Sequence, residues 1–454
     1  MAVDTNQIKT VILVMMENRS FDHLLGHLSL TVPAFPVNGL KAPVIQYNNI
    51  YNGTPYPPFS LPNDDYLTTD VPHEYNFVAT QLDAQPQTGR FRMRGFVKAY
   101  ADAIGEPPNL QCDPMKYFTA RQVPMSHFLA TRFCTCDRWF SPLPTSTQPN
   151  RTIAFCGDSP IYRTETKLID VEQSIFKWME QQGISWRVYH EAFSFFTLYP
   201  SMWKYVLSKN FKRFPYFMAD MQREVVANTP QVIIVEPCYQ DAPHFTSIHA
   251  NDNHAPLSIN WGEQFLRNVY LGATVNPEKW AHTVMVIYYD EHGGFYDHEP
   301  PPKIPYSVNG NDPHEFNSMG PRIPGIIVSP FVSPGKPYSG LLDHTSVLQF
   351  LAEVFKKDPI SKTVTNRKKL NVTSILEALQ EVGPLIVPPI PPSIPLPAMT
   401  SLGASMVKQP DSAMMISFEE AGNQIMAMEP DKVYECYPEL YNWKVSTEKL
   451  RPLQ

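Results

Sequence analysis

Short apolar runs constrain the fold of this chain most strongly. Runs rich in valine and isoleucine lie at residues 9–16, 185–189, 231–235, 283–289 and 323–328. Longer segments with a helical period separate them. Strands that are apolar on both faces are typical of a parallel sheet that helices cover on each side. The sequence therefore predicts an α/β fold with a mostly parallel sheet between helices.

The segments between these runs predict the helices and the domain limits. Helices are expected over 171–181, 256–271 and 344–356, the last with Asp343 as its N-cap. Proline-rich loops lie at 33–62 and 297–324, and residues 384–397 hold seven prolines. We predict a catalytic core over 1–383, an extended segment over 384–399 and a C-terminal appendage over 400–454.

Composition and charge exclude several classes of protein. The net charge of -7, from 37 basic and 44 acidic residues, gives no electrostatic footprint for nucleic acid. The apolar run at 11–16 is too short for a signal peptide, and no apolar stretch would span a bilayer. We expect a soluble protein, cytoplasmic or secreted without its leader. The six cysteines are interpreted as buried thiols, with room for one or two disulfides.

Polar residues stand where two of the predicted strands end. Glu17 and Asn18 follow the first strand, and Asp290 and Glu291 follow the fourth. Adjacent carboxylates repel unless a cation lies between them, and carboxylate and carboxamide oxygens are hard-metal ligands. The two pairs are therefore interpreted as metal ligands, with a helix cap as the alternative for the first pair.

A third segment, PTSTQPNR at 144–151, has hydroxyls at the expected start of a helix. A helix N-terminus stabilises anions and activates a nucleophile. Thr147 is the candidate nucleophile, Asn150 a candidate phosphate donor, and Arg151 a phosphate clamp or a structural anchor. Helix capping is the alternative interpretation.

Two histidines complete the candidate site. His254, in NDNHAP at 251–256, and His73, after Asp70-Val71-Pro72, would act as general acid or contact a phosphoryl group. Purely structural histidines are the alternative.

Four motifs together resemble one family of phosphoesterases. ENRSFDH at 17–23, STQPNR at 146–151, NDNHAP at 251–256 and DEHGGFYDH at 290–298 are similar to those of non-specific phospholipases C and bacterial acid phosphatases. The resemblance spans about residues 8–356 and implies an alkaline-phosphatase-like fold. It departs at NDNHAP, which the family usually has as NDDHP: one charge is removed and an alanine is inserted before the proline, which leaves the placement of His254 open.

The resemblance also implies roles for individual residues. Glu17, Asn18, Asp290 and Glu291 match metal ligands, and Thr147 matches a nucleophile that also lies at the metal. His73 and His254 match histidines that contact the phosphoryl group or protonate the leaving alcohol.

The expected function is a metal-dependent hydrolysis of phosphate esters. The resemblance implies a phospholipase C-like enzyme that cleaves phospholipid phosphodiesters through a phospho-threonine intermediate. A broad-specificity acid phosphatase with the same site is the alternative, and a non-catalytic binding protein on the same fold is a further one. Oxygen ligands favour one calcium, magnesium or manganese ion.

The expected partner is a phosphate ester, with phospholipid at a membrane surface as one form, and not a nucleic acid. The sequence does not determine an oligomeric state. An aromatic stretch at 193–205 is interpreted as core packing, with a lipid-contact patch as the alternative.

Overall fold

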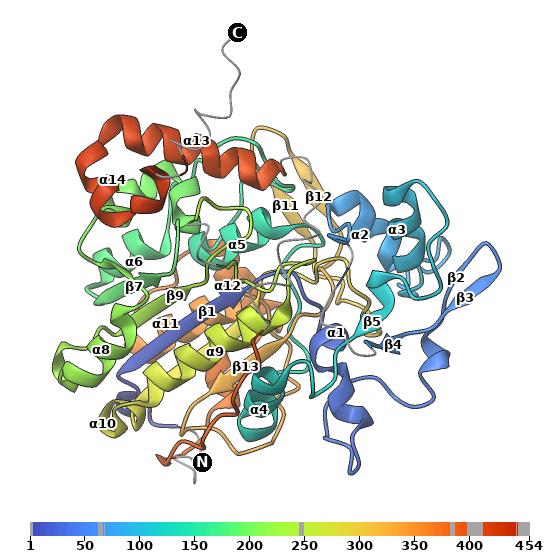
Figure 1. Cartoon of the computed structure of the whole chain (residues 1–454), viewed down its shortest axis with the longest axis horizontal. Coiled ribbons are helices and arrows are strands. Elements are labelled where there is room, and N and C mark those ends of the chain that lie inside the picture. The colour runs from blue at the N-terminus through green and yellow to red at the C-terminus, as the bar shows by residue number, and fades with distance from the viewer. Residues whose placement is uncertain are drawn as a thin grey trace.

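A computed structural model describes residues 3–61, 67, 69–244, 249–381, 386–396, 412–441 and 443. Its centre is a seven-stranded sheet with the order β6-β13-β10-β1-β9-β7-β8 (Figure 1). The strands are β1 (Thr10–Met16), β6 (Cys134–Thr135), β7 (Trp186–His190), β8 (Phe211–Arg213), β9 (Val232–Glu236), β10 (Thr283–Tyr289) and β13 (Gly325–Val328). β10, β1, β9, β7 and β8 run parallel, whereas β13 runs antiparallel to β10 and to β6. The predicted mostly parallel α/β sheet is confirmed.

Each predicted strand exists, with small shifts of its limits. The run at 323–328 begins later, at Gly325, and is the antiparallel member. Pro324 precedes it and has no N–H group to donate to a neighbouring strand. Because the period of a strand does not record its direction, the sequence alone did not distinguish this strand from the parallel ones.

Helices cover both faces of the sheet, with α8, α9 and α10 in front of it and α11 and α12 behind it in Figure 1. The helices are α1 (Phe21–Leu25), α2 (Tyr75–Leu82), α3 (Phe96–Ile104), α4 (Pro124–Arg132), α5 (Thr147–Cys156), α6 (Ile175–Gln182), α7 (Trp203–Val206), α8 (Tyr216–Arg223), α9 (Ile259–Thr274), α10 (Pro277–Trp280), α11 (Thr345–Phe355), α12 (Lys362–Lys369), α13 (Ala413–Met428) and α14 (Pro430–Cys436). Three two-stranded sheets lie in the loops: β2 (Asn49–Tyr51) with β3 (Thr54–Tyr56), β4 (Phe59–Ser60) with β5 (Lys116–Tyr117), and β11 (Tyr306–Val308) with β12 (His314–Phe316).

Helix caps explain where the predicted helices begin. α6 starts after Ser174, whose hydroxyl accepts from the amide of Lys177, and α9 starts after Ser258, whose hydroxyl accepts from the amide of Asn260. The N-cap of α11 is His344 and not the predicted Asp343. Asp343 nevertheless accepts from the amide of Thr345 at 2.7 Å, so its carboxylate still satisfies a free N–H group at the start of the helix.

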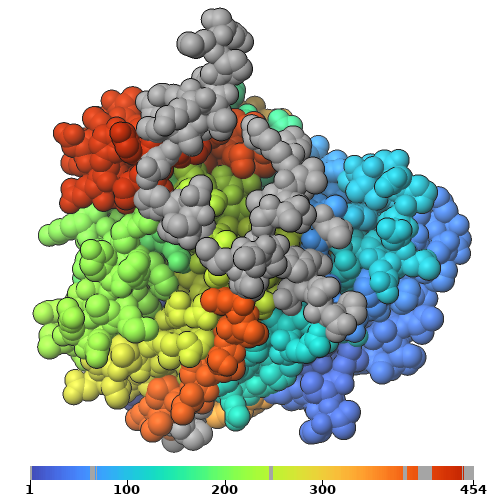
Figure 2. All heavy atoms as spheres, viewed as in Figure 1, coloured from blue at the N-terminus to red at the C-terminus, as the bar shows by residue number. Residues whose placement is uncertain are grey.

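The predicted C-terminal appendage is joined to the main core in its described part. Residues 386–396 run along α9, where Tyr270 donates to the carbonyl of Pro389. Phe418 of α13 and Tyr437 after α14 are buried in the same apolar cluster as β1 and β10. Figure 2 shows α13 and α14, in red, lying directly on the green part of the chain. The rest of residues 382–411 and most of 442–454 lie outside the described residues.

Other expectations concern thiols, aromatics and membranes. The six cysteines are free thiols, and all but Cys436 are buried. Phe195, Phe196, Tyr199 and Trp203 are buried, which agrees with core packing and not with a lipid-contact patch. Within the described part of the chain, every helix is too short or too polar to cross a bilayer.

A pair of histidines connects the segment after α1 to α4. His27 Nε2 lies 3.0 Å from His127 Nδ1, and His27 is buried. Burial lowers the pKa of His27 to about 3, and the neighbouring His127 ring adds to that effect. The folded protein therefore holds His27 uncharged over a pH range in which an unfolded histidine takes up a proton.

This pair predicts a loss of stability in acid. Because the folded pKa of His27 is lowered from 6.5 to about 3, the unfolded state binds one more proton between these pH values, and the free energy of unfolding falls with decreasing pH. His27→Gln should reduce this slope by up to about 1.4 kcal/mol per pH unit. Urea denaturation between pH 4 and pH 6.5 measures it. The matched control is His282→Gln, at a partly exposed position, and an unchanged slope for His27→Gln would contradict the prediction.

Candidate active site

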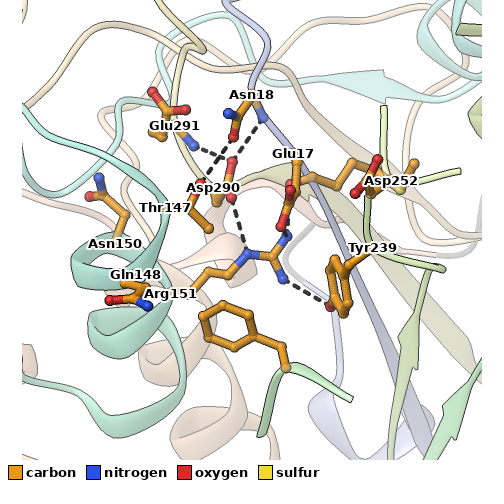
Figure 3. Close-up of polar contacts among 12 residues, drawn as sticks. Glu17, Asn18, Thr147, Gln148, Asn150, Arg151, Tyr239, Asp252, Asp290 and Glu291 are labelled. Atoms are coloured by element: carbon orange, nitrogen blue, oxygen red, sulfur yellow. Dashed lines mark hydrogen bonds and ion pairs between the residues drawn. The ribbon is translucent and has the colours of Figure 1, made fainter. Parts of the chain in front are cut away.

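The site forms where the ends of two neighbouring strands meet. β1 and β10 pair in parallel with Met16 opposite Tyr289, so the residues that follow each strand lie side by side. The amide of Asn18 donates to Asp290 Oδ1 at 3.0 Å. Glu17, Asn18, Asp290 and Glu291 are all buried. The structure thus brings together the two polar pairs that the sequence placed at strand ends (Figure 3).

The two turns after these strands pack tightly against each other. Asn18 has a φ of 58°, a left-handed conformation that asparagine adopts more readily than most residues. Gly293 has a φ of 63°, and a Cβ atom there would overlap the backbone carbonyl of Asn18. Gly293 therefore permits the close approach of the two turns.

Thr147 reaches this strand edge from the first turn of α5. Its hydroxyl donates to Asn18 Oδ1 at 3.1 Å. The N-cap of α5 is Ser146, whose side chain makes no capping bond and accepts instead from the hydroxyl of Thr164. The hydroxyl of Thr147 is therefore not used as a helix cap. It contacts Asn18, in the turn that follows β1.

Asn150 supports the loop that leads to Thr147. Its Oδ1 accepts from the amide of Leu143 at 2.9 Å, and its Nδ2 donates to carbonyls of Leu143, Thr145 and Ser146. The polar atoms of this side chain are thus engaged with backbone. The geometry favours a positioning role over the predicted phosphate contact.

Arg151 lies between the two strand ends as a buried cation. Its Nε donates to Asp290 Oδ2 at 3.0 Å, its NH2 lies 3.2 Å from Glu17 Oε1, and its NH1 donates to the hydroxyl of Tyr239 at 3.0 Å. Burial lowers the pKa of Arg151, but Tyr239, Glu17 and Asp290 outweigh burial and raise it. Of the two interpretations, the contacts favour the structural anchor over the phosphate clamp.

The oxygen atoms left over fit a hard cation. Glu291 Oε2 accepts from the amide of Gly293, whereas Glu291 Oε1 is buried without a hydrogen-bond partner. A buried carboxylate oxygen without a partner is costly, so a cation there would be favourable. Burial also raises the pKa of Glu17 well above its usual value. A further group, Glu17 with Asp252 and His254, lies close enough together to hold an ion.

His254 stands on the other side of Glu17. Its Nδ1 lies 3.5 Å from Glu17 Oε2, and its Nε2 lies 3.3 Å from Asp70 Oδ1. Burial lowers the pKa of His254, but the carboxylates of Asp70, Asp241 and Glu17 outweigh it and raise the pKa well above its usual value. These carboxylates therefore favour the protonated form of the ring.

His73 lies near His254, with ring centroids 6.1 Å apart. Its Nδ1 donates to the carbonyl of Val71, and its Nε2 lies 3.3 Å from Asn18 Nδ2. Burial lowers the pKa of His73, but Glu291 and Asp70 raise it to about 9. Asn18 thus touches both Thr147 and His73.

The unusual NDNHAP loop still places His254 at the site. The amide of Glu17 donates to the carbonyl of Asp252 at 2.8 Å, and the amide of His254 donates to Asp252 Oδ1 at 3.0 Å. Asn253 Nδ2 donates to the hydroxyl of Tyr289 at 2.6 Å. These bonds tie the loop to β1 and β10 in spite of the inserted alanine.

Some residues of the site were not found from the sequence. Tyr239 follows β9, so the rule that polar residues gather at strand ends would have found it. Asp70 and Asp241 lie in irregular loops and carry no motif of their own. Only the fold places their carboxylates beside His254.

Comparison with known proteins identifies related sequences. The model of the Phosphoesterase family matches residues 8–357. Non-specific phospholipase C3 of Arabidopsis thaliana is 28% identical over 374 residues, which cover 77% of this chain and 69% of that protein. Non-specific phospholipase C6 of Arabidopsis thaliana is 30% identical over 340 residues (72% and 62%). Hemolytic phospholipase C of Pseudomonas aeruginosa is 28% identical over 412 residues (77% and 53%). The chain thus spans between about half and about two thirds of the length of these relatives.

Solved structures give weaker similarities. Phosphonate monoester hydrolase of Agrobacterium radiobacter has a TM-score of 0.37 at 9% identity and covers 83% of this chain and 78% of its own. A protein in the alkaline phosphatase superfamily from Vibrio parahaemolyticus has a TM-score of 0.32 at 11% identity (58% and 64%). The family assignment rests on the sequence matches and not on these structures.

The position of Arg151 predicts that the fold depends on its charge. Arg151→Met keeps most of the volume but leaves Glu17 and Asp290 buried without their cation, which should cost about 3–5 kcal/mol of the free energy of unfolding. Urea denaturation measures this loss. The control is Arg163→Met, at a side chain that is 47% exposed. A loss no larger than that of the control would show that Arg151 is not the anchor.

Proposed function

The chain belongs to the phosphoesterase family, as its motifs predicted, and from that membership we propose that it is a metal-dependent, phospholipase C-like hydrolase of phospholipid phosphodiesters. The observation that carries the proposal is the hydrogen bond from Thr147 Oγ1 to Asn18 Oδ1 at 3.1 Å. It sets a hydroxyl beside three buried carboxyl groups and near two histidines whose pKa the neighbouring carboxylates raise. Such a cluster supports nucleophilic attack on phosphorus with acid assistance.

One divalent cation belongs to this proposal. Asn18, Thr147, Glu291, Asp290 and Glu17 would hold it, and their oxygen atoms favour calcium, magnesium or manganese. Glu291 Oε1, which has no hydrogen-bond partner, is the best-placed donor. When bound, such an ion neutralises charge on phosphoryl oxygens and favours the alkoxide form of a hydroxyl that it contacts.

The reaction proposed for these residues has two halves. Thr147 Oγ1 gives its proton to solvent and attacks phosphorus, the bond from phosphorus to the glycerol oxygen breaks, and His254 gives its proton to the departing diacylglycerol. The head-group phosphate is then esterified to Thr147. Water attacks this phospho-threonine in the second half and gives one proton to His254. The bond from phosphorus to Thr147 Oγ1 then breaks, Thr147 takes up a proton from solvent to regain its hydroxyl, and the phosphomonoester leaves.

His73 and α5 would stabilise the charge that builds up on phosphorus. The positive charge of His73 lies beside the amide of Asn18, which itself contacts Thr147. The N-terminus of α5 adds its partial positive charge at the same place. Arg151 and Asn150 are proposed to act by holding α5 and its loop, not by touching phosphate.

We expect Thr147→Ala to lower head-group release from phosphatidylcholine vesicles by about 10³-fold or more, because no other hydroxyl replaces the nucleophile. Thr147→Ser keeps a hydroxyl and should retain measurable turnover. Metal binding by Thr147→Ala should persist, since the other oxygen donors remain. Near-normal turnover by Thr147→Ala would refute the nucleophile, and faster turnover of p-nitrophenyl phosphate than of phosphatidylcholine by the wild type would make the enzyme a phosphomonoesterase.

A second variant tests the metal. Glu291→Gln removes the charge of the unpartnered carboxylate and should weaken the binding of manganese or calcium by about 10-fold or more, with a parallel loss of activity. Equilibrium dialysis with each metal gives the affinity, and chelation followed by metal addition gives the activity. Glu315→Gln, at an exposed position, is the control. Unchanged metal affinity in Glu291→Gln would remove this residue from the ligand set.

A further inference from the structure

We propose that α13 is a positioning element of the active site, which sets the placement of Thr147, Arg151 and His254 through Ser417, Phe418 and Ser412. This inference rests on the proposed function for its catalytic readout. α13 lies beyond residues 8–357, the part of the chain that matches the family. α13 nevertheless contacts residues that lie directly behind Thr147, around Arg151 and beside His254.

Ser417 contacts the helix that carries Thr147. Gln148, the next residue, donates from Nε2 to Ser417 Oγ at 2.9 Å, and both side chains are fully buried. In Figure 3 the side chain of Gln148 points away from the strand ends towards which Thr147 points. The Oε1 atom of Gln148 accepts from the amide of Glu165 at 2.8 Å. Gln148 Nε2 also donates to the carbonyl of Glu165 at 3.2 Å and to Met414 Sδ at 3.6 Å. The first turn of α5 is therefore held from behind, and Ser417 is one of the residues that hold it.

Phe418 contacts the rings that enclose Arg151. The guanidinium of Arg151 lies 4.9 Å from the ring centroid of Tyr239 and 4.9 Å from that of Phe195. Phe418 packs on both rings, with centroids 6.3 Å from Tyr239 and 6.2 Å from Phe195. Cation–π contacts depend on where the rings lie, so Phe418 holds in place the two rings that contact the Arg151 guanidinium. That guanidinium in turn pairs with Glu17 and Asp290.

Ser412 connects the start of α13 to the histidine side of the site. Its hydroxyl oxygen accepts from the amide of Met415 as the N-cap, and its side chain also bonds to the carboxylate of Asp241. Asp241 Oδ2 lies 4.0 Å from His254 Nδ1. One helix thus links the nucleophile side to the acid side.

Other contacts anchor the C-terminal segment, so positioning and anchoring can be separated. Arg213 pairs with the buried Glu439 at 2.8 Å, and Tyr437 packs on His190. These contacts lie away from Gln148 and Tyr239 in the chain and hold the segment to β7 and β8. Ser417→Ala removes one hydrogen bond and little volume, so the anchor stays intact.

The experiment compares Ser417→Ala and Phe418→Leu with the wild type, in the full chain with metal bound and at a temperature where each is folded. We expect kcat for the hydrolysed ester to fall by about 10-fold, because a small displacement of the nucleophile costs rate more than binding. KM should stay within about twofold, since neither residue is proposed to contact substrate. Asn423→Ala, at an exposed position of the same helix, is the control and should leave kcat unchanged.

Hydrogen exchange gives a readout that needs no activity. In Ser417→Ala the amides of α5 should exchange faster than in the wild type, whereas those of β1 and β10 should not. If the wild type hydrolyses no ester, the proposed function fails, and exchange still tests α13. A wild-type kcat in both variants of an active enzyme, or wild-type exchange in α5, would overturn the inference.

Discussion

The ion pairs of Arg151 are the interaction on which the rest of the site depends. One guanidinium contacts the ends of β1 and β10, through Glu17 and Asp290, and the tyrosine after β9. It is carried by the helix that presents Thr147. Because carboxylates cannot be buried side by side without compensating charge, this cation lets the strand ends keep their acidic residues. It also fixes the helix by the same contacts.

With the charges of Glu17 and Asp290 compensated by Arg151, the other polar residues of the site lie in two groups, one on each side of Glu17. Glu291 keeps one oxygen atom without a partner, and Asn18 turns its amide towards Thr147 and His73. On the far side of Glu17, the carboxylates of Asp70 and Asp241 raise the pKa of His254. The proposed site would therefore hold an acceptor set for a cation beside a proton donor. Both would assist the hydrolysis of a phosphate ester, since charge develops on the phosphoryl oxygens and on the leaving oxygen.

The sequence predicted the parts of the site that follow from strand ends, and not those that follow from packing. The sequence could predict the site residues Glu17, Asn18, Asp290 and Glu291, because neighbouring parallel strands bring their carboxyl ends to one edge of the sheet. The role of Arg151 stayed open between clamp and anchor, since only its contacts decide it. The strand at 323–328 was found but not its direction. The bond between Gln148 and Ser417 joins residues 269 positions apart, which no periodicity records.

The bond between Gln148 and Ser417 suggests how the position of Thr147, and with it the reaction rate, can be changed from outside the site. The residues proposed to react all fall within the family match, whereas α13 lies outside it and reaches them through Gln148, Tyr239, Phe195 and Asp241. A change in α13 would alter the distance from Thr147 to its partners without altering any reacting group. Rate depends steeply on that distance, while metal and substrate contacts depend on the strand ends. Under these proposals, the residues that carry the chemistry lie apart in the chain from the α13 residues that help to set its geometry.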